Sequence, residues 1–392
     1  MKFVIIDGGV IGTAVARELA GRKAGEIVIL EKEPSLGRHA SGRNSGVLHS
    51  GINQKPGSLK ARMCVRGSRL MREHCRKRGV PMRECGTLVI ARNPAESKTL
   101  GQLLEMGKAC EVPNLTMLTE AKLKHKEPLC KGQEALFSPT GASVDSLALL
   151  ESLAGEARDR GVVYRMGIKV SEIEGMTLAT TEGLVEADYL VNCAGLYADR
   201  IAHRTGIGNN YQIIPFRGEY REVLNCDVRS MIYRAPDLRY PFLSIHLTRE
   251  TDGRVLAGPT ADIAFGREAY RKEWHPGEAA EMILSRQFRK LISDSEFIKL
   301  VRENILLSLS PKAFLREIQT LVSGVTMKQI HPYRSGIRAQ LVDQEGKMVM
   351  DMLVEQSEKA LHVLNAVSPG MTCALAFAEY AVDRILGITH KG

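Results

Sequence analysis

The sequence predicts an α/β protein in which a domain with a parallel β-sheet is interleaved with an α+β domain built on a mixed or antiparallel sheet. Three segments near the N-terminus support this prediction. Residues 2–6 (KFVII) and 26–31 (EIVILE) are apolar runs, and residues 10–22 between them carry apolar side chains at helical spacing. Apolar runs joined by such a helix are typical of parallel strands that are buried on both faces of a sheet.

Two later segments fit the same parallel sheet. Residues 188–193 (DYLVNC) lead into a turn of small residues, and residues 360–364 (ALHVL) precede a helical stretch at 371–386. The long insertions between these pieces contain alternating strand patterns and amphipathic helices, which favour a second domain. We therefore expect one discontinuous domain from residues 1–83, 136–212 and 334–392, and another from residues 84–135 and 213–333.

The composition excludes several classes of protein. The chain of 392 residues has 44% hydrophobic and 25% charged residues, which is ordinary for a folded globular protein. It contains no apolar run of the ~18 residues that a membrane-spanning helix requires. Because a strand-like pattern begins at residue 2, we expect no signal or transit peptide.

Cysteine spacing and charge give further expectations. The eight cysteines are scattered without a CxxC pair, so we expect no metal site, no disulfide scaffold and a reducing cytoplasmic location. The net charge of +9 is spread along polar helix faces, where Arg and Lys alternate with Glu and Asp. No aromatic residues interleave with these charges, so we expect no nucleic-acid partner. The positive excess could attract an anionic substrate or an anionic membrane surface.

A glycine-rich turn follows the first predicted strand. It reads Asp7-Gly8-Gly9-Val10-Ile11-Gly12, and Glu31 closes the second predicted strand at the spacing typical of dinucleotide sites. In a Rossmann-like fold, the glycines let the backbone approach a pyrophosphate at a helix N-terminus, and the acidic residue accepts hydrogen bonds from a ribose. This order of elements predicts a Rossmann-like dinucleotide-binding domain. One position departs from the G-x-G-x-x-G pattern, because Asp7 replaces its first glycine.

The residues after the second strand indicate which dinucleotide is bound. Residues 41–51 (SGRNSGVLHSG) are small and polar, whereas simple nicotinamide dehydrogenases continue with ordinary βα units at this point. A loop of Ser, Asn and Gly beside the second strand suits a flavin nucleotide. The sequence therefore favours a flavin over a nicotinamide cofactor.

Six blocks of sequence, spread over nearly the whole chain, match the pattern of one family. They are RNSGVLHSG at 43–51, NCAGLYADRIA at 192–202, PFRGEY at 215–220, PDLRYPFLSIHLT at 236–248, SGIRAQ at 335–340 and HVLNAVSPGMT at 362–372. With these blocks the chain resembles the L-2-hydroxyglutarate dehydrogenase/oxidase family, within the FAD-dependent flavoproteins similar to D-amino-acid oxidase. The resemblance implies that the cofactor is FAD and that L-2-hydroxyglutarate is oxidised to 2-oxoglutarate.

The resemblance also implies which residues contact FAD. They comprise the glycine turn with its acidic residue, the polar loop, an adenine contact, a small-residue turn and the start of the last helix, whose positive end can stabilise negative charge on the reduced flavin. In this order they are Gly8, Gly9, Gly12 and Glu31; Ser41, Arg43, Asn44 and Ser45; Val170; Ala194 and Gly195; and Gly370, Met371 and Thr372.

Oxidation of a 2-hydroxy acid requires a cation for the carboxylate and a base for the hydroxyl proton, while hydride leaves Cα for flavin N5. Arg338 in SGIRAQ is the expected carboxylate clamp, because a guanidinium binds both oxygens. The alternative is a sheet arginine paired with Asp343 or Glu345. His49, directly after the flavin loop, and His246 are both candidate bases, and the sequence does not choose between them.

Strand alternation places His246 on the same face as Phe242 and Ser244. A five-carbon diacid also requires a second cation. The candidates are Lys60, Arg217, Arg249 and Arg334. The chain carries Asn53-Gln54 where the family usually has an aromatic pair, and this polar pair could reshape the mouth of the pocket.

Two other hypotheses remain open at this point. The first is an FAD enzyme of the same fold that acts on another anionic substrate, such as a different 2-hydroxy acid, glycerol 3-phosphate or an amino acid. The second is a weakly flavin-binding pseudoenzyme, in which Asp7 weakens cofactor binding. The expected electron acceptor is oxygen or a quinone, and a quinone would imply peripheral attachment to the cytoplasmic face of a membrane.

Overall fold

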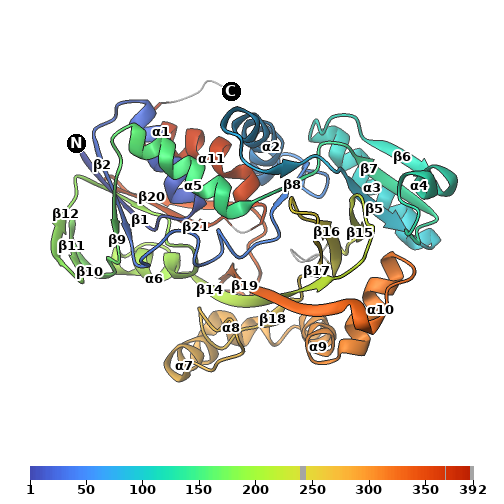
Figure 1. The fold of residues 1–392 in the computed structure, drawn as a ribbon. Helices are drawn as coiled ribbons and strands as arrows, with labels where there is room; N and C mark the ends of the chain where they lie inside the picture. Colours follow the sequence, from blue (N-terminus) through green and yellow to red (C-terminus); the bar gives the residue numbers. More distant parts are fainter. Residues whose placement is uncertain (239–243, 367, 389–392) are drawn as a thin grey trace.

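Two large β-sheets organise the protein (Figure 1). The computed structural model describes the whole chain except residues 239–243, 367 and 389–392. One sheet lies near the N-terminus and is covered by helices, and the other extends away from it toward the opposite end of the molecule. This arrangement confirms the predicted α/β fold, with a Rossmann-like part and an α+β part.

The first sheet has six strands in the order β20-β21-β13-β1-β2-β9. Neighbouring strands are parallel except for the antiparallel pair β20 and β21. The bounds of the strands are β1 (Lys2–Ile6), β2 (Glu26–Glu31), β9 (Val163–Met166), β13 (Tyr189–Asn192), β20 (Leu353–Gln356) and β21 (Ala360–Asn365). The apolar segments that the sequence predicts as strands of one parallel sheet therefore form β1, β2, β13 and β21.

Both faces of this sheet are covered. One face carries the helices α1 (Val10–Gly21), α5 (Ser146–Asp159) and α11 (Gly370–Ile385), and the other carries α6 (Ala198–Arg204) and the small sheet of β10 (Val170–Glu174), β11 (Thr177–Thr180) and β12 (Gly183–Glu186). Phe3 and Ile5 of β1 pack with the three helices. Val4 and Ile6 pack with the small sheet and α6. Burial on both faces explains why the strand is a continuous apolar run.

The second sheet has nine strands, of which eight follow the order β18-β14-β17-β16-β15-β5-β7-β6, while β19 pairs with β14. All pairs are antiparallel except the parallel pair of β15 and β5, as expected for a mixed sheet. The bounds are β5 (Thr87–Ala91), β6 (Thr116–Thr119), β7 (Glu134–Ser138), β14 (Tyr211–Val223), β15 (Met231–Arg234), β16 (His246–Arg249), β17 (Val255–Gly258), β18 (Asp262–Ile263) and β19 (Ile330–Asp343).

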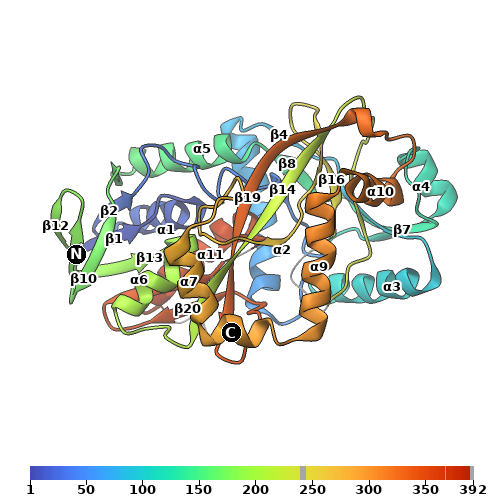
Figure 2. The same cartoon turned by 90° about the horizontal axis from the view of Figure 1, so that it is seen from below.

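Six helices surround the second sheet (Figures 1 and 2). They are α3 (Pro94–Ala109), α4 (Glu120–Lys126), α7 (Pro276–Leu284), α8 (Arg286–Leu291), α9 (Ser295–Leu309) and α10 (Pro311–Leu321). Phe314 and Ile318 of α10 pack against β5, β15 and β16. Phe288 of α8 and Phe297 of α9 pack against β14. These apolar contacts hold one face of the long strand β14.

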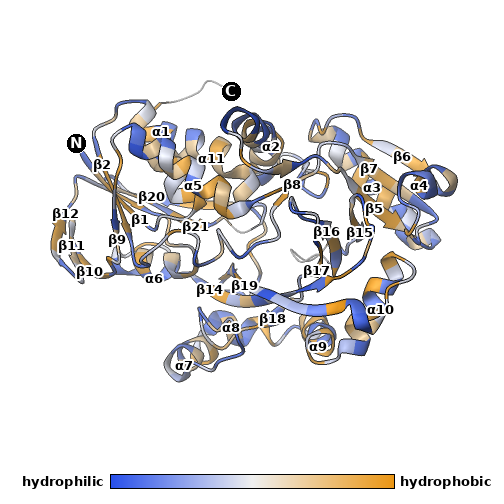
Figure 3. Ribbon diagram, viewed as in Figure 1, coloured by the Kyte–Doolittle hydropathy of each residue, from blue (hydrophilic) through white to orange (hydrophobic). Residues whose placement is uncertain are grey.

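The long helix α2 (Leu59–Arg78) packs closely on α11. Gly67 permits this approach, because a Cβ at this position would clash with the carbonyl oxygen of Thr372. Figure 3 shows a largely hydrophilic α2 beside a more hydrophobic α11. The remaining short elements are β3 (Val47–Leu48), β4 (Met82–Arg83), β8 (Ala142–Val144), η1 (Gly195–Tyr197) and η2 (Met327–Gln329). None of the helices in the described part of the chain combines the length and apolar character needed to cross a membrane.

The antiparallel pair of β14 and β19 connects the two halves of the molecule (Figure 2). Phe216 of β14 lies opposite Arg338 of β19 in this pairing, and Tyr220 lies opposite Arg334. The pair therefore brings side chains of the nine-stranded sheet next to elements of the six-stranded sheet.

Three of the expected domain boundaries fall inside strands. The boundary after residue 135 lies in β7, that after residue 212 lies in β14, and that after residue 333 lies in β19. Each of these strands lies entirely in the nine-stranded sheet, so a division by sheets would keep each strand whole. The assignment of two interleaved domains remains a prediction.

Candidate functional site

A cavity of about 690 Å³ runs along the carboxyl ends of β1, β2 and β13 to the N-terminus of α11 and to β14 and β19. Carboxyl ends of parallel strands are the usual place for a dinucleotide in an open α/β sheet. The residues predicted for the site line this cavity, except Gly8 and Gly12. Those that line it are Gly9, Glu31, Ser41, Arg43, Asn44, Ser45, His49, Val170, Ala194, Gly195, His246, Arg338, Gly370, Met371 and Thr372.

The turn between β1 and α1 has the shape that the glycine pattern predicts. Asp7 adopts a left-handed backbone conformation with φ of 87°, which Asp tolerates better than most residues other than Gly. A Cβ on Gly12 would clash with the carbonyl oxygen of Asp7, so only glycine fits at this position. Gly8 and Gly12 thus shape the turn from behind, while Gly9 faces the cavity.

The first amides of α1 already have acceptors. The N–H of Gly9 donates to Oδ1 of Asp7 at 2.9 Å, and the N–H of Val10 donates to Oγ of Ser41 at 2.9 Å. The first backbone bond of the helix runs from Thr13 N–H to the carbonyl of Gly9. These amides are the groups that bind phosphate in a dinucleotide fold. Asp7 therefore occupies a donor that a pyrophosphate would use.

Glu31 lies at the end of β2, where a ribose would bind. Its Oε2 accepts the N–H of Gly8 at 2.9 Å, and its Oε1 accepts the N–H of Glu33 at 2.8 Å. Both bonds fix the carboxylate at the edge of the cavity. Glu31 lines this cavity and is otherwise buried, with 5% of its surface exposed. This position fits an acceptor for ribose hydroxyls.

The polar loop after β2 is held by its own side chains. Asn44 Oδ1 accepts the N–H of Gly46 at 2.8 Å and the hydroxyl of Ser146 at 2.7 Å. The guanidinium of Arg43 lies 4.3 Å from the ring centre of Tyr270, and its Nε donates to the carbonyl of Arg38 at 2.7 Å. These contacts hold the loop along the cavity wall, and the ring of Tyr270 lies against the guanidinium of Arg43.

A network of charged side chains lines the cavity near Glu31. The ammonium of Lys32 contacts Glu33, Glu268 at 2.7 Å and Nε2 of His39 at 2.8 Å. Glu33, His39 and Glu268 are the one group among the described residues whose side chains approach one another closely enough to hold a metal ion. Lys32 already supplies a positive charge to this group. Sequence reasoning missed this network, because its members come from two distant segments.

The start of α11 contacts the loop that carries His49. The hydroxyl oxygen of Thr372 accepts the N–H of His49 at 3.0 Å, and Thr372 Oγ1 lies 3.4 Å from the carbonyl oxygen of Val47. Gly370 and Met371 line the cavity just before Thr372. The N-terminal end of this helix therefore faces the cavity next to His49, where its partial positive charge favours an anionic group.

His49, His246 and Arg338 meet at one end of the cavity. Burial, and then the charges of His246, Arg338 and Lys60, lowers the pKa of His49 to about 4. The pKa of His246 is also lowered to about 4, mainly by burial and further by Arg338, against the raising effect of its bond to Ser244. Burial lowers the pKa of Arg338. Both imidazoles are consequently neutral at physiological pH and able to accept a proton.

The bond of His246 defines its tautomer. Its Nδ1 lies 3.2 Å from the carbonyl oxygen of Ser244, and a carbonyl only accepts, so Nδ1 carries the proton. Nε2 is then the nitrogen with a lone pair. Ser244 therefore contacts His246 through its backbone carbonyl. Phe242, which was also expected on the same face as His246, lies outside the described residues. The ring of Tyr233 meets His246 edge-on at 6.2 Å, and Asn53 Nδ2 lies 3.4 Å from the Tyr233 hydroxyl.

Tyr220 is a site residue that sequence reasoning missed. It lies on β14, lines the cavity and is only 8% exposed. Burial raises the pKa of its hydroxyl, while Arg338, Arg334 and a hydrogen bond with Ser45 lower it, so the phenol stays protonated. The block PFRGEY contains this tyrosine, but nothing in the local pattern shows that it meets Arg338.

The alternative partners of Arg338 are occupied elsewhere. Asp343 Oδ1 accepts the N–H groups of Glu345 and Lys347, each at 2.9 Å. Glu345 pairs with Arg286 at 3.2 Å. Both carboxylates therefore have partners other than Arg338 in the described part of the chain.

The four candidate second cations do not line the cavity formed by the described residues. Arg249 pairs with Asp227 at 3.2 Å, and Arg334 pairs with Glu250 at 2.6 Å. Arg217 lies 3.5 Å from Glu219, and Lys60 is buried, with its pKa lowered by burial. Two of them still act on residues that line the cavity, since the charge of Lys60 lowers the pKa of His49 and that of Arg334 lowers the pKa of Tyr220.

Comparisons with known proteins agree with this geometry. The family described as "DAO: FAD dependent oxidoreductase" matches residues 2–384. The chain is 35% identical to the mitochondrial L-2-hydroxyglutarate dehydrogenase of Bos taurus, over 97% of this chain and 88% of that protein. It is 34% identical to L-2-hydroxyglutarate dehydrogenase of Indibacter alkaliphilus, over 98% of this chain and 99% of that protein.

Solved structures share the fold. Reduced L-α-glycerophosphate oxidase from Mycoplasma pneumoniae with FAD bound superposes with a TM-score of 0.77 at 22% identity, over 97% of this chain and 94% of that one. Glycine oxidase from Geobacillus kaustophilus superposes with a TM-score of 0.75 at 19% identity, over 99% of this chain and 95% of that one.

Proposed function

Because the chain belongs to the DAO family of FAD dependent oxidoreductases, we propose that it oxidises L-2-hydroxyglutarate to 2-oxoglutarate with FAD as the hydride acceptor. The family match confirms the resemblance seen in the sequence blocks and the expectation of FAD. The substrate is proposed from the curated relatives, which cover nearly all of this chain and carry that activity in their names.

One observation carries the proposal for the chemistry. A half-buried guanidinium, Arg338, lies beside two neutral imidazoles, His49 and His246, at one end of the cavity. Oxidation of a 2-hydroxy acid needs a cation for the carboxylate and a neutral base for the hydroxyl. The three side chains supply both requirements.

We assign Arg338 to the C1 carboxylate of the substrate, because its two nitrogens can bind both oxygens in one plane. His246, through Nε2, or His49 then takes the hydroxyl proton. His246 has the stronger geometric case, because its bond to Ser244 leaves Nε2 as the acceptor. Tyr220 would donate its phenolic hydrogen to the same carboxylate, since it lies close to Arg338 and stays protonated.

The remaining predicted residues would hold the cofactor, which supplies a two-electron acceptor at the reacting carbon. Glu31 would accept the ribose hydroxyls, and Val170 would flank the adenine. The turn around Gly9 would face the pyrophosphate. The N-terminal end of α11 at Gly370 would stabilise negative charge on the reduced ring system.

The test is a substrate panel under anaerobic conditions, in which flavin bleaching at equal substrate concentration is followed by absorbance. L-2-hydroxyglutarate should bleach the flavin fastest, and the D-enantiomer should leave it oxidised. L-lactate, glycerol 3-phosphate and glycine test the other substrate classes. A faster response to any of these would replace the proposed substrate while keeping the FAD enzyme.

A shorter 2-hydroxy acid is the second candidate substrate. The observation that favours it is the lack, among the described residues, of a candidate second cation lining the cavity for the distal carboxylate. Asn53 contacts the hydroxyl of Tyr233, whose ring in turn contacts His246. It therefore adds a polar group where the family usually has an aromatic residue. L-lactate in the same panel distinguishes this candidate, because it has one carboxylate.

The proposal also covers the electron acceptor and the location of the protein in the cell. We propose oxygen or a quinone as the acceptor, and a cytoplasmic protein that attaches to a membrane surface if a quinone is used. Reoxidation of the bleached enzyme by air and by a soluble quinone, measured in parallel, separates the two acceptors. Binding to anionic vesicles, measured by sedimentation, tests the attachment.

A further inference from the structure

The turn that would hold the FAD pyrophosphate contains two carboxyl groups that bind adjacent amides. Asp7, in the place of the first motif glycine, turns its side chain back so that Oδ1 accepts the N–H of Gly9 at 2.9 Å. Glu31 reaches the same turn from β2, where its Oε2 accepts the N–H of Gly8 at 2.9 Å. Adjacent amides of one turn are therefore bound by two different acids.

Asp7 and Glu31 are neighbours in this turn, because the amides that they accept belong to the consecutive residues Gly8 and Gly9. Carboxylates offer only acceptors, so the two side chains can share a hydrogen bond only when one of them carries a proton. Burial, and then the negative charge of Glu31, raises the pKa of Asp7 well above its usual range. Two negative charges on adjacent amides of one turn repel each other, and this repulsion favours a form in which one of the two carboxyl groups is protonated.

The other ionisable groups around the pair do not neutralise its negative charge in place of this proton. Lys32 lowers the pKa of Asp7, but its ammonium is shared with Glu33 and Glu268. The thiol of Cys193 at the end of β13 has its pKa raised by burial and by Asp7, so it is neutral. The phenol of Tyr270 likewise has its pKa raised, mainly by burial, and stays protonated.

The acid pair faces the cavity at the expected pyrophosphate position. Asp7 and Gly9 line the cavity, and Oδ2 of Asp7 lies 3.7 Å from the point that a Cβ on Gly195 would occupy on the opposite wall. The space between this turn and Gly195 is where the glycine pattern brings the backbone close to phosphate. FAD would add two phosphate charges next to the pair.

We propose that Asp7 and Glu31 share one proton and that FAD binds tightly only to the form of the protein that holds it. The phosphate charges make that proton harder to remove in the complex than in the free protein. By linkage, FAD affinity is constant at low pH and falls as the pH rises through the range in which the free protein loses the proton. For a single proton, the dissociation constant rises up to about tenfold per pH unit in that range.

The experiment is a titration of apoprotein with FAD, followed by flavin fluorescence, between about pH 6 and about pH 8.5, where FAD itself does not change charge. The dissociation constant of the wild-type protein should rise at least about tenfold across this range. Asp7→Asn keeps the shape, the acceptor for Gly9 and a donor for Glu31, but cannot lose a proton. It should bind FAD at high pH as tightly as the wild-type protein does at low pH.

Asp7→Gly is the second variant, in case Asn distorts the turn. It should also show a flat pH profile and bind FAD more tightly than the wild-type protein at about pH 8.5. Asp188→Asn is the matched control, because this acid sits at the other end of β1, where it binds the N–H of Lys2. It should keep the wild-type slope.

A flat profile in the wild-type protein would overturn the proposal. A slope that persists in both Asp7 variants would also overturn it, because another group would then carry the proton. The titration needs no substrate, so its outcome is independent of the proposed reaction.

Discussion

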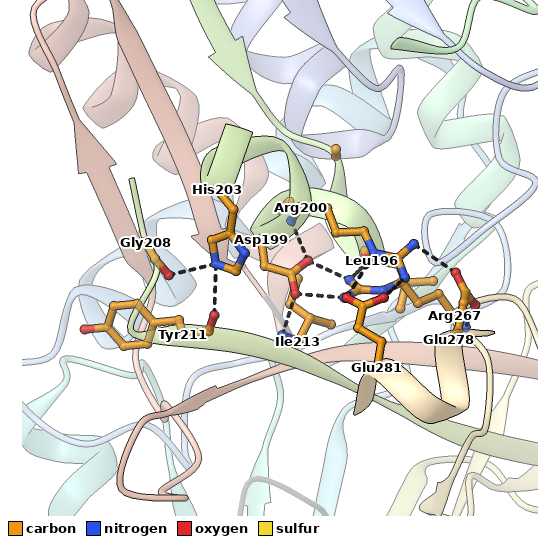
Figure 4. A network of polar contacts seen from close by, with 12 residues as sticks. Leu196, Asp199, Arg200, His203, Gly208, Tyr211, Ile213, Arg267, Glu278 and Glu281 are labelled. Carbon is orange, nitrogen blue, oxygen red and sulfur yellow. Dashed lines mark hydrogen bonds and ion pairs between the residues drawn. The ribbon is translucent and has the colours of Figure 1, made fainter. Parts of the chain in front are cut away.

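Asp199 and Arg267 form a buried ion pair with two parallel hydrogen bonds (Figure 4). Nη1 of Arg267 lies 2.6 Å from Oδ1 of Asp199, and Nη2 lies 2.9 Å from Oδ2. Asp199 is 1% exposed and Arg267 is 4% exposed. Oδ2 of Asp199 also accepts the N–H of Ile213 at 2.9 Å. The pair thus joins α6, the start of β14 and the segment before α7.

Asp199→Asn should lower the free energy of unfolding by about 3 kcal/mol, because Arg267 would remain buried without its paired charge. The other nearby carboxylate, that of Glu281, lies 3.8 Å away and is partly exposed. Urea denaturation followed by circular dichroism measures the loss. Glu345→Gln is the control, since it breaks an exposed pair with Arg286 and should change stability by less than about 1 kcal/mol. Equal losses in the two variants would contradict this prediction.

Arg338→Lys should reduce kcat/KM for the 2-hydroxy acid by roughly 10- to 150-fold, while the protein keeps its FAD. Lysine keeps the charge but loses the two-pronged geometry of the guanidinium. Steady-state kinetics and the flavin spectrum measure the two effects. Arg286→Lys is the control, because Arg286 forms an exposed pair with Glu345 and does not line the cavity. Unchanged kinetics in Arg338→Lys would remove this arginine from the site.

Replacement of the proton acceptor by Asn should slow flavin reduction by roughly 10²- to 10⁴-fold. The variants are His246→Asn and His49→Asn, and stopped-flow absorbance measures the rate. The true base should show the full loss, and the other histidine a smaller one. Wild-type rates in both variants would show that neither histidine is the base.

The pH profile offers an independent check on the same histidines. Burial lowers the pKa of both to about 4, so the base is neutral throughout the physiological range. As the pH falls, activity should decline only near pH 4, where the imidazole takes up a proton, and not near the usual histidine value of about 6.5. The acidic limb of kcat/KM should disappear in the variant that lacks the base.

Tyr220→Phe should lower kcat/KM by about tenfold, because the substrate carboxylate would lose one hydrogen bond from a neutral donor. The ring itself stays, so packing and FAD content should not change. Tyr233→Phe is a suitable control, since the Tyr233 hydroxyl contacts Asn53 and its ring meets His246 without lining the cavity. A loss in Tyr233→Phe as large as that in Tyr220→Phe would point to a general change in the pocket.

FAD should be bound without a covalent link. Cys193 is a cysteine that lines the cavity, and the burial that raises its pKa keeps it as an unreactive thiol. His49 and His246 also line it, and the sequence carries no recognisable flavin-attachment motif. Acid precipitation should release the yellow colour into the supernatant, and colour that stays in the pellet would contradict this prediction.

The local patterns in the sequence predicted the elements that begin the six-stranded sheet. The segment from residue 2 to Glu31 forms β1, α1 and β2, with the second strand at the predicted bounds. These elements could be read because apolar periodicity and glycine positions are properties of neighbouring residues. The family match further confirmed the expected FAD cofactor.

The meeting of His49, His246 and Arg338 could be expected only through the family resemblance. His49 follows β3, His246 begins β16 and Arg338 lies on β19, so three separate segments supply them. Tyr220 and the charged network around Lys32 could not be predicted from the sequence, because their partners also come from segments far apart in the chain. Strand alternation gives the face of a side chain, but not the element that packs against that face.

The sequence by itself determined three features: the succession of β1, α1 and β2, the glycine turn between β1 and α1, and the acid at the end of β2. Each of them depends on contacts within about 30 residues. Only the tertiary structure decided that Asp7 and Glu31 bind adjacent amides of one turn, and that Arg338 lies beside two neutral histidines. The physical reason is burial. Elements from both sheets and α11 line the cavity around these groups and remove them partly from water, and the loss of water influences which of them hold protons.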